Sequence, residues 1–364
     1  MRKVVKSILK NVFTGASAAT AVMLVLVAYS DHFDPEKHPF LGCVGMVFPF
    51  FLIANLLILI VWLFINWKRS WIPLVAYLLA IPAIRVYFPL HFRHEPPAGS
   101  LKVISYNVDC YNEVKSAPNS QVLVYNYLKQ QNADIVCLQE DVAIKPDSTF
   151  QLSHLYPYND TVHMGNLKSS LINAVGVHSR YPILRKEKLA FDSNANGAAA
   201  FFLLIGHDTV CVVNLHLEST HLTNVDRKRY SDIISGDMDH NQAEAETRMI
   251  YGKLSAAMAQ RARQADWLHN YIERHSRYPL IVCGDMNDTP ISYVRRTVAQ
   301  GLTDCYVESG CGLGFSYRRK GFRFRIDNIF CSSHFEPYNC YVDDTVEASD
   351  HYPVITWLHR QPAQ

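Results

Sequence analysis

The stretch LIVCGDMND, residues 280–288, joins a short apolar run to a group of polar residues. The run over residues 280–283 is rich in β-branched side chains and predicts a buried strand. Asp285 and Asn287 follow where that strand ends. Because a strand end offers rigid backbone, side chains at this point can be held in fixed positions. The stretch therefore predicts a sheet whose edge carries functional groups.

Five further segments place polar side chains at the ends of apolar strands. They are ISYNVD (104–109), DIVCLQED (134–141), VVNLHLE (212–218), FRIDNIF (324–330) and ASDHYP (348–353). The polar residues that they supply are Asn107, Glu140, His216, Asp327, Asp350 and His351. Alone, each such residue is more often a turn former than a functional group. Strands are predicted over residues 101–107, 135–139, 174–178, 199–205, 210–217, 280–283, 324–331 and 354–358.

Helical periodicity predicts two helices between these strands, over residues 120–131 and about 245–274. The second has an apolar stripe that also contains Arg261, which fits either an ion-paired residue at the edge of the stripe or a substrate contact. Two β-layers covered by helices are the simplest way to bury so many short strands. The expected fold class is therefore α/β, with two sheets flanked by helices.

The combined polar residues indicate a class of chemistry. Carboxylates and carboxamides suit a hard cation that prefers oxygen ligands, and two imidazoles suit proton transfer. The sequence contains no CxxC, HExxH, Walker lysine loop, GxGxxG or GxSxG motif. These absences remove support for zinc, nucleotide-driven, nicotinamide and serine-hydrolase chemistry. What remains is metal-assisted attack of water on a phosphate ester.

The order of the motifs SYN, LQE, NLH, GDMN, RIDNIF and SDH resembles the endonuclease/exonuclease/phosphatase superfamily over residues 101–358. The resemblance implies a four-layer α/β sandwich of two mixed sheets flanked by helices, with the site at the mouth between the sheets. It also implies a divalent metal, for which we expect Mg²⁺, although Mn²⁺ or Ca²⁺ accept the same oxygen ligands. The metal ligands that it implies are Glu140, Asn107 and Asp350.

The resemblance assigns the remaining motif residues to catalysis. Asp285 would orient or deprotonate the attacking water, and Asn287 would hold that water or a phosphate oxygen. His351, oriented by Asp327, would contact the scissile phosphate. His216 would protonate the leaving group or contact the phosphate. A protein that keeps the fold and binds a phosphorylated ligand without turnover remains the alternative from another class.

The first 95 residues read as a membrane anchor. Residues 11–30 and 41–66 carry no charge, and each run is long enough to cross a bilayer as a helix. Residues 71–90 form a weaker third span because they contain Arg85 and three prolines. We expect an uncleaved anchor of about three helices over residues 1–95, with a two-helix form as the alternative. A Pro and Gly linker then leads to a catalytic domain over residues 101–360.

Charge predicts a multi-pass membrane protein with its catalytic domain on the extracytoplasmic side. Basic residues precede the first span and follow the second, whereas the first loop is rich in acidic residues and histidine. Cysteine usage does not decide the compartment. Cys305 with Cys311, or Cys331 with Cys340, are the candidate disulfides.

Substrate identity rests on weaker signals. A basic group precedes Asp327 and fits either a solvated charge run or an anion-binding site; its members are Arg318, Arg319, Lys320, Arg323 and Arg325. Residues 96–364 carry 26 basic and 29 acidic residues, a net charge of −3, which does not favour a nucleic acid. The expected partners are the bilayer and a phosphorylated substrate, such as a lipid head group, an envelope phosphodiester or a nucleotide. A membrane-bound phosphodiesterase or phosphatase of bacterial type ranks first and an extracellular nuclease second; no protein partner is predicted.

Overall fold

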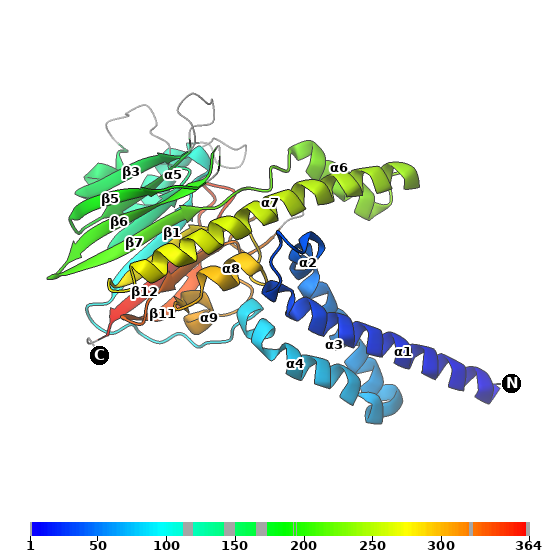
Figure 1. Cartoon of the computed structure of the whole chain (residues 1–364). Coiled ribbons are helices and arrows are strands. Elements are labelled where there is room, and N and C mark those ends of the chain that lie inside the picture. The colour runs from blue at the N-terminus through cyan, green and yellow to red at the C-terminus, as the bar shows by residue number, and fades with distance from the viewer. Residues whose placement is uncertain are drawn as a thin grey trace.

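Two β-sheets follow the N-terminal helices along the chain (Figure 1). The computed structural model describes residues 2–111, 119–141, 150–164, 173–191, 193, 195–319 and 323–361. The first sheet has the strand order β11-β12-β1-β2-β4-β3. In chain order its strands are β1 (Leu101–Asn107), β2 (Ile135–Gln139), β3 (Tyr158–Met164), β4 (Asn173–Ser179), β11 (Phe335–Val342) and β12 (Val354–Arg360).

The second sheet has the order β5-β6-β7-β8-β10-β9. Its strands are β5 (Ile183–Leu189), β6 (Gly197–Ile205), β7 (Asp208–His216), β8 (Leu280–Asp285), β9 (Thr303–Asp304) and β10 (Asp327–Cys331). The eight strands predicted from sequence are confirmed, although β10 begins three residues later than expected. Both sheets are mixed, because β1 and β2, and likewise β7 and β8, run parallel while the other pairs are antiparallel.

Four strands escaped sequence prediction because their patterns are not apolar. β5 reads ILRKEKL and is exposed along most of its length. β3 and β11 carry polar residues and, in β11, Pro337. All three lie at an edge of a sheet, and β9 is a two-residue edge strand. Edge strands contact a neighbour on one side only, so hydrophobic pattern marks them poorly.

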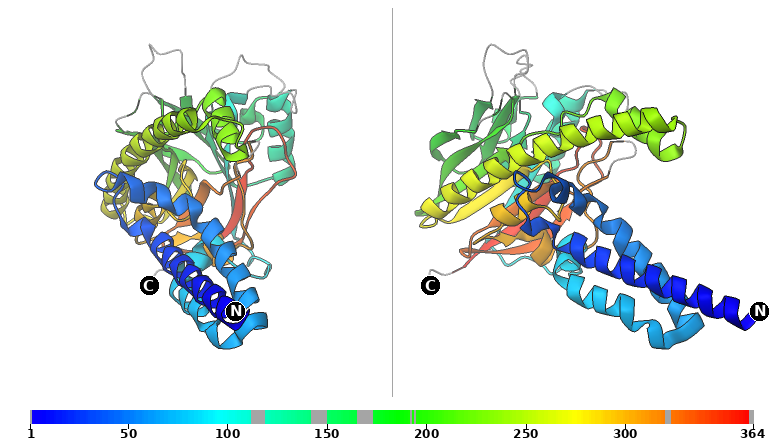
Figure 2. Two further views of the ribbon diagram at one scale, coloured as in Figure 1. Left: turned by 90° about the vertical axis from the view of Figure 1, so that its right-hand side faces the viewer. Right: turned by 45° about the vertical axis from the view of Figure 1, so that its right-hand side comes forward.

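Helices cover the outer faces of both sheets, so the fold is the expected four-layer sandwich (Figures 1 and 2). One apolar core lies between the sheets and includes Val177 and Phe201. A second joins Phe202 to Leu268 of α7, and a third joins Ile104 to Leu128 of α5. The helices of this region are α5 (Ser120–Gln131), α6 (Asn224–Ser235), α7 (His240–Arg274), α8 (Tyr293–Val298) and α9 (Cys305–Ser309).

Residues 2–87 form a helical bundle that we call the N-terminal helical unit. Its helices are α1 (Arg2–Ala28), α2 (Pro39–Val44), α3 (Phe48–Asn66) and α4 (Trp71–Tyr87), with 3-10 turns η1 (Ser30–His32), η2 (Gly45–Val47) and η3 (Trp67–Arg69). Two apolar helical stretches, Val4–His32 and Pro39–Arg69, are long enough to cross a membrane. α4 is shorter, at 17 residues.

The N-terminal helical unit packs directly against the sandwich. A Cβ built on Gly45 would clash with the carbonyl oxygen of Ile291, so only glycine permits this close approach. Arg263 of α7 forms an ion pair with Glu36 at 3.0 Å. α6 and the first half of α7 extend beyond the sheets on the side where the N-terminal helical unit lies (Figures 1 and 2).

The candidate disulfides do not form. All nine cysteines lie in the described part of the chain and are free thiols. Cys305 Sγ instead lies 3.9 Å from Cys331 Sγ, in the core between the sheets. Cys137, Cys211 and Cys283 are buried in strands, where they act as small apolar side chains.

Candidate active site

Strand register brings the motif residues of the second sheet into one row. β7 pairs with β8 so that His216 stands opposite Asp285, and β8 pairs with β10 so that Asp285 stands opposite Asp327. Gly284, with φ of 141°, is needed here because a Cβ would clash with the backbone of Leu215 on β7. The close approach of the two strands therefore depends on glycine and aligns three functional groups.

Asp285 is the central residue of the site. Its Oδ2 atom accepts a hydrogen bond from Asn107 Nδ2 at 3.1 Å, which joins the ends of the two sheets. The same oxygen lies 3.6 Å from His216 Nε2 and 3.7 Å from His351 Nε2. Its Oδ1 atom accepts the backbone N–H of Asn287 at 2.7 Å. Residues from both sheets thus meet at one buried carboxylate.

The pKa of Asp285 is raised from 3.8 to about 6. Burial is the main cause, and the nearby Asp327 carboxylate adds to it. The charges of His351 and His216 offset part of the increase. A carboxylate with a pKa near neutrality can accept a proton from water and release it again, as a general base must.

His351 and Asp327 form a buried pair, with His351 Nδ1 at 2.8 Å from Asp327 Oδ2. Burial alone would lower the pKa of His351, but Asp327 and Asp285 outweigh it and hold that pKa well above its usual value. Ser316 Oγ accepts the backbone N–H of Asp327 at 3.1 Å, and Ser349 Oγ accepts that of His351 at 3.1 Å. Serine hydroxyls therefore hold the backbones of both residues, and the two carboxylates favour the cationic form of the imidazole.

Glu140 follows β2 and has a left-handed backbone, with φ of 54°. Its Oε1 atom accepts Asn107 Nδ2 at 3.3 Å and lies 3.9 Å from His216 Nε2. Its Oε2 atom accepts the thiol of Cys110 at 3.3 Å. An unusual backbone conformation held by surrounding contacts is a feature of functional sites.

Asp350 lies at the opposite side of His351. Its Oδ1 atom is 4.0 Å from His351 Nε2, and its Oδ2 atom accepts Nε of Arg319. Burial alone would raise the pKa of Asp350, but the positive charges of His351 and Arg319 outweigh it and lower that pKa. Asp350 therefore stays ionised beside the pocket.

The remaining two residues are held by neighbours. Asn287 also has a left-handed backbone, and its Nδ2 atom donates to the carbonyl of Leu217 at 3.0 Å. His216 is oriented by Asn173, whose Nδ2 atom lies 3.1 Å from His216 Nδ1. Every residue that the resemblance assigned to metal binding or catalysis thus lies within one constellation or on its rim.

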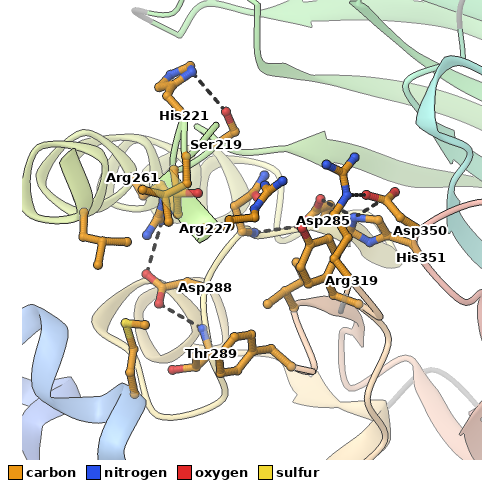
Figure 3. A pocket seen from close by; sticks show the side chains of 18 of the residues that line it. Ser219, His221, Arg227, Arg261, Asp285, Asp288, Thr289, Arg319, Asp350 and His351 are labelled. Atoms are coloured by element: carbon orange, nitrogen blue, oxygen red, sulfur yellow. Dashed lines mark hydrogen bonds and ion pairs between the residues drawn. The ribbon is translucent and has the colours of Figure 1, made fainter. Parts of the chain in front are cut away.

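A cavity of about 260 Å³ opens onto these residues (Figure 3). Its walls include Glu140, His216, Asp285, Asn287, Asp350 and His351. Sequence reasoning missed Asp109, Arg227 and Tyr317, which also line it, and Asn173, which orients His216. The ISYNVD motif contains Asp109 and could have indicated it. Arg227 and Tyr317 come from segments with no motif, so no sequence signal marks them.

The basic group before Asp327 divides in the structure. Arg319 lines the cavity. Arg318 does not, because it pairs with Glu347 at 3.2 Å and donates to the carbonyl of Ser349. Arg323 is exposed and also lies outside the cavity lining, and Lys320 lies outside the described residues.

The prediction that Arg325 binds substrate is wrong. Its guanidinium is buried and donates to the backbone carbonyls of Leu313, at 2.8 Å, and of Val86 and Tyr87 in α4. It therefore joins the sandwich to the N-terminal helical unit. Arg261, for which two interpretations were open, is buried and ion-paired with Asp288 at 3.3 Å.

The donor set fits a divalent cation. Ligand atoms of Asp285, Asp327 and His351, which the resemblance assigns to catalysis and not to metal binding, lie within 4.8 Å of one another and add negative charge to the site. Asp327 Oδ1 is buried and has no hydrogen-bond partner among the described residues. The carboxylates of Glu140, Asp285 and Asp350 border the same cavity. Oxygen-rich, negatively charged sites of this type suit Mg²⁺ or a similar hard ion.

Three solved structures show what this chain is similar to. The catalytic domain of human nocturnin with bound sulfate shares 18% sequence identity and a TM-score of 0.51, covering 74% of this chain and 97% of that chain. Truncated TDP2 of Caenorhabditis elegans shares 17% identity, with a TM-score of 0.49 and coverage of 72% and 99%. Sphingomyelinase C from Streptomyces griseocarneus shares 19% identity, with a TM-score of 0.48 and coverage of 72% and 100%. A search of curated protein sequences gave no match.

Family profiles divide the chain at the same place as the structure. Residues 10–87 match a domain of unknown function, DUF8431. Residues 104–351 match the endonuclease/exonuclease/phosphatase family, and this match contains every motif residue of the site. The family acts on phosphate esters and depends on divalent metals. The chain therefore belongs to the endonuclease/exonuclease/phosphatase family of metal-dependent phosphoester hydrolases.

Proposed function

We propose that the chain is a membrane-anchored hydrolase that cleaves phosphodiesters or phosphomonoesters by attack of a water molecule on phosphorus. The observation that carries the proposal is the meeting of Asn107 and Glu140 from one sheet with His216, Asp285 and Asp327 from the other. Six segments spread over residues 104–353 contribute to one cavity or its rim. No structural need of a sandwich explains so many charged groups buried at one point.

Asp285 accepts the proton of the attacking water. Its Oδ2 atom faces the other polar groups, and its raised pKa makes it a competent base. Asn287, held at Asp285 Oδ1 by its backbone N–H, would position the water or a phosphate oxygen. A new bond forms between the water oxygen and phosphorus as that proton moves to Asp285.

His351 and His216 act on the charge that the attack creates. His351 is cationic and would stabilise the negative phosphoryl oxygens, while Asp327 keeps its ring in place. His216 Nε2, 3.6 Å from Asp285, would donate a proton to the leaving oxygen as the bond between phosphorus and that oxygen breaks. The products are an alcohol and a phosphate or phosphomonoester.

The residues that would hold the divalent ion are Glu140, Asn107 and Asp350, with Mg²⁺ expected and Mn²⁺ or Ca²⁺ able to replace it. When bound, the ion supplies charge that polarises the phosphoryl oxygens and stabilises the leaving oxygen. Arg319 keeps Asp350 oriented toward the cavity.

The proposed anchor comprises residues 1–95, and the proposed catalytic domain comprises residues 101–360. The three long helices of the N-terminal helical unit alternate in direction, since Phe13 of α1 packs on Trp62 at 4.8 Å while Phe48 packs on Tyr87 at 5.3 Å. Their apolar side chains are largely exposed: Phe64 is 87% exposed and Leu78 is 65% exposed. A surface of this kind suits a bilayer.

Charge supports an extracytoplasmic catalytic domain. Arg69 donates to the carbonyl of Lys10 at 3.3 Å, so the basic residues of two segments gather at one end of the bundle. The acidic residues Asp31, Asp34 and Glu36 lie at the other end, beside the sandwich. Positive residues prefer the cytoplasmic side, which leaves the site outside. A reporter fused after residue 364 tests this orientation; reporter activity in the cytoplasm would overturn it.

Hydrolysis of bis(p-nitrophenyl) phosphate by the full chain tests the reaction. We expect metal-dependent release of p-nitrophenol, and loss of at least about 100-fold in kcat/KM in Glu140→Ala because the cation loses its principal ligand. Glu336→Ala, which removes an exposed carboxylate from β11, is the matched control. Equal turnover in both variants would remove Glu140 from the site, and absence of turnover with any divalent ion would remove the proposed reaction. Plasmid nicking that outpaces hydrolysis of lipid or sugar phosphates would favour the nuclease alternative.

A further inference from the structure

The cavity has an apolar half that the proposed reaction does not use. Its polar half contains the carboxylates and imidazoles described above. The other half is lined mainly by apolar side chains from three separate parts of the chain, beside the buried Arg261–Asp288 ion pair: Met46, Leu222, Ile250, Leu254 and Met258. A small hydrophilic phosphate ester would leave this wall in contact with water, which is unfavourable for apolar surface.

Three residues of the apolar wall form a regular row on one helix. Ile250, Leu254 and Met258 are spaced four residues apart on α7, so they lie on one face of that helix. Ile250 is 6% exposed and Met258 is 2% exposed, although both border the cavity. The row therefore forms a continuous strip that runs away from the catalytic groups along α7.

The N-terminal helical unit closes the wall from the other side. Met46 belongs to η2, next to Gly45, which abuts the backbone of Ile291. Cys43 Sγ lies 3.4 Å from Met258 Sδ, so α2 and α7 are in contact at the row. Figure 3 shows the N-terminal helices, in blue, on the side of the pocket opposite Asp350 and His351. The apolar half of the cavity is thus shared with the proposed membrane anchor.

The projecting pair of helices α6 and α7 has further apolar side chains at its surface. Val225 is 57% exposed, Tyr230 is 41% exposed and Tyr251 is 37% exposed. These helices project on the same side of the sandwich as the N-terminal helical unit (Figure 2). Exposed apolar residues next to membrane-spanning helices suit contact with lipid.

Cationic groups lie at the polar half of the same cavity. Arg227 and Arg319 both line it, beside the carboxylates proposed to hold the divalent ion. An occupant of the whole cavity therefore needs an anionic phosphate at one end and a hydrocarbon chain at the other.

From this arrangement we propose that the substrate is a membrane lipid phosphoester. Its phosphate lies at Asp285 and His351, and its hydrocarbon chain lies along Ile250, Leu254 and Met258 and passes Met46 toward the bilayer. This inference rests on the proposed function, and the bonds made and broken are those given above. The occupant is a lipid of the bilayer that holds the anchor, and not a soluble ester.

A series of chromogenic diesters tests the inference in the full chain held in lipid nanodiscs. The probes are methyl, butyl and octyl p-nitrophenyl phosphate, which share one leaving group and differ only in chain length. We expect kcat/KM to rise from the methyl to the octyl ester by about tenfold or more, since one fully buried methylene corresponds to about fourfold, or ~0.8 kcal/mol. In Leu254→Gln and Met46→Gln the octyl-to-methyl ratio falls severalfold below the wild-type ratio.

Leu204→Gln is the control variant, because Leu204 is a partly exposed leucine on β6 outside the cavity lining. It should keep the wild-type ratio. The control also distinguishes contact with the apolar wall from simple partition of long esters into the nanodisc, because partition affects all variants equally. Hydrolysis of the methyl ester by each variant reports that its catalytic site is folded.

The outcomes are distinct. Hydrolysis of all three esters at equal kcat/KM, or a ratio that Leu254→Gln does not change, overturns the lipid inference and leaves the proposed reaction intact. Faster cleavage of a single-stranded oligonucleotide than of the octyl ester, insensitive to Leu254→Gln, also overturns it, in favour of a nucleic acid. No hydrolysis of any ester with Mg²⁺, Mn²⁺ or Ca²⁺ overturns both proposals together.

Discussion

Two buried histidine–aspartate pairs in the described part of the sandwich are joined by a hydrogen bond, and the geometry of the two bonds is almost the same. His351 Nδ1 lies 2.8 Å from Asp327 Oδ2 at the cavity. His178 Nε2 lies 3.0 Å from Asp141 Oδ2 in the first sheet. Each histidine is at most 6% exposed. The contact between the two side chains therefore does not tell which pair is functional.

The surroundings of the pairs differ. Asp141 also accepts the hydroxyl of Tyr111 at 2.7 Å and that of Thr161 at 3.4 Å, so both of its oxygens are satisfied. Burial would raise the pKa of Asp141, but His178 and these hydroxyls lower it. Asp327 Oδ1, in contrast, has no partner among the described residues. His178 Nδ1 and Asp327 Oδ1 each lack a partner among the described residues, so it is the carboxylates, and not the whole pairs, that differ. A carboxylate whose oxygens are both satisfied stabilises a fold, whereas one with an unused oxygen beside a cavity can act on a ligand.

Replacing each histidine by alanine gives the largest expected contrast. His351→Ala should lower kcat/KM by about 1000-fold, because it removes the cationic group that faces the phosphate. His178→Ala should leave kcat/KM within about fivefold and lower the free energy of unfolding by about 2–4 kcal/mol, because Asp141 is left buried and unpaired. Steady-state kinetics and thermal unfolding of the same samples measure both. A large loss of activity in His178→Ala would erase the distinction.

Neutralising the two carboxylates sharpens the comparison through pH. Asp327→Asn removes a negative charge that raises the pKa of His351, so the cationic imidazole is lost at a lower pH. The alkaline limb of the pH profile should move to lower pH, and kcat should fall by about 100-fold. Asp141→Asn should leave the alkaline limb in place, since Asp141 contacts His178 and not His351. The profile of kcat/KM against pH measures the difference.

Asp285 extends the contrast to stability. Its pKa is about 6 in the folded chain against 3.8 ordinarily, so between these values the native state binds more protons than the unfolded state. Stability of the metal-free protein should therefore fall as pH rises through this window. Asp285→Asn should remove that dependence and raise the stability of the metal-free protein above pH 6 by about 1–3 kcal/mol.

The unfolding midpoint in detergent with a chelator, followed by near-UV circular dichroism across pH, measures the Asp285 effect. Asp141→Asn is the counterpart, because the pKa of Asp141 is lowered and not raised. It should lower stability where Asp285→Asn increases it. A fall in the midpoint for both variants would contradict the assignment of Asp285 as a buried carboxylate whose ionisation destabilises the fold.

Arg319 gives the smallest expected effect. Arg319→Ala should raise KM about three- to tenfold, because Asp350 loses the cation that orients it beside His351 and the cavity loses a positive charge. Arg318→Ala is the matched control, since Arg318 pairs with Glu347 outside the cavity. Equal KM values in the two variants would remove Arg319 from the substrate region.

The two pairs also show what sequence could reveal. Asp327 and His351 belong to strand-end motifs, and the strands that hold them are apolar and buried, so hydrophobic pattern located them. The edge strands β3 and β5 have no such pattern, and α6 is highly charged, so they were missed. The same central strands carried the candidate site, which is why its main residues could be proposed together.

Long-range contacts were beyond sequence reasoning. Arg325 stands in a basic run beside a motif, yet its guanidinium turns to the carbonyls of α4, more than 200 positions earlier. Asn173 has no motif of its own and reaches His216 only because the two sheets face each other. Such pairings follow from topology, and local pattern carries no information about them.

The contact between the N-terminal helical unit and the sandwich, at Gly45 and Arg325, has a kinetic consequence. With the N-terminal helical unit across a bilayer, as proposed, these contacts would keep the catalytic site at a constant height and tilt over the membrane, whereas a domain on a flexible linker would move freely. The catalytic site would then meet a lipid substrate by diffusion in the plane of the membrane. The rate would depend on the mole fraction of that lipid in the leaflet and not on its concentration in the bulk. Diluting the substrate lipid with an inert one, at unchanged total amounts per litre, should slow such an enzyme, whereas a freely swinging domain would respond far less.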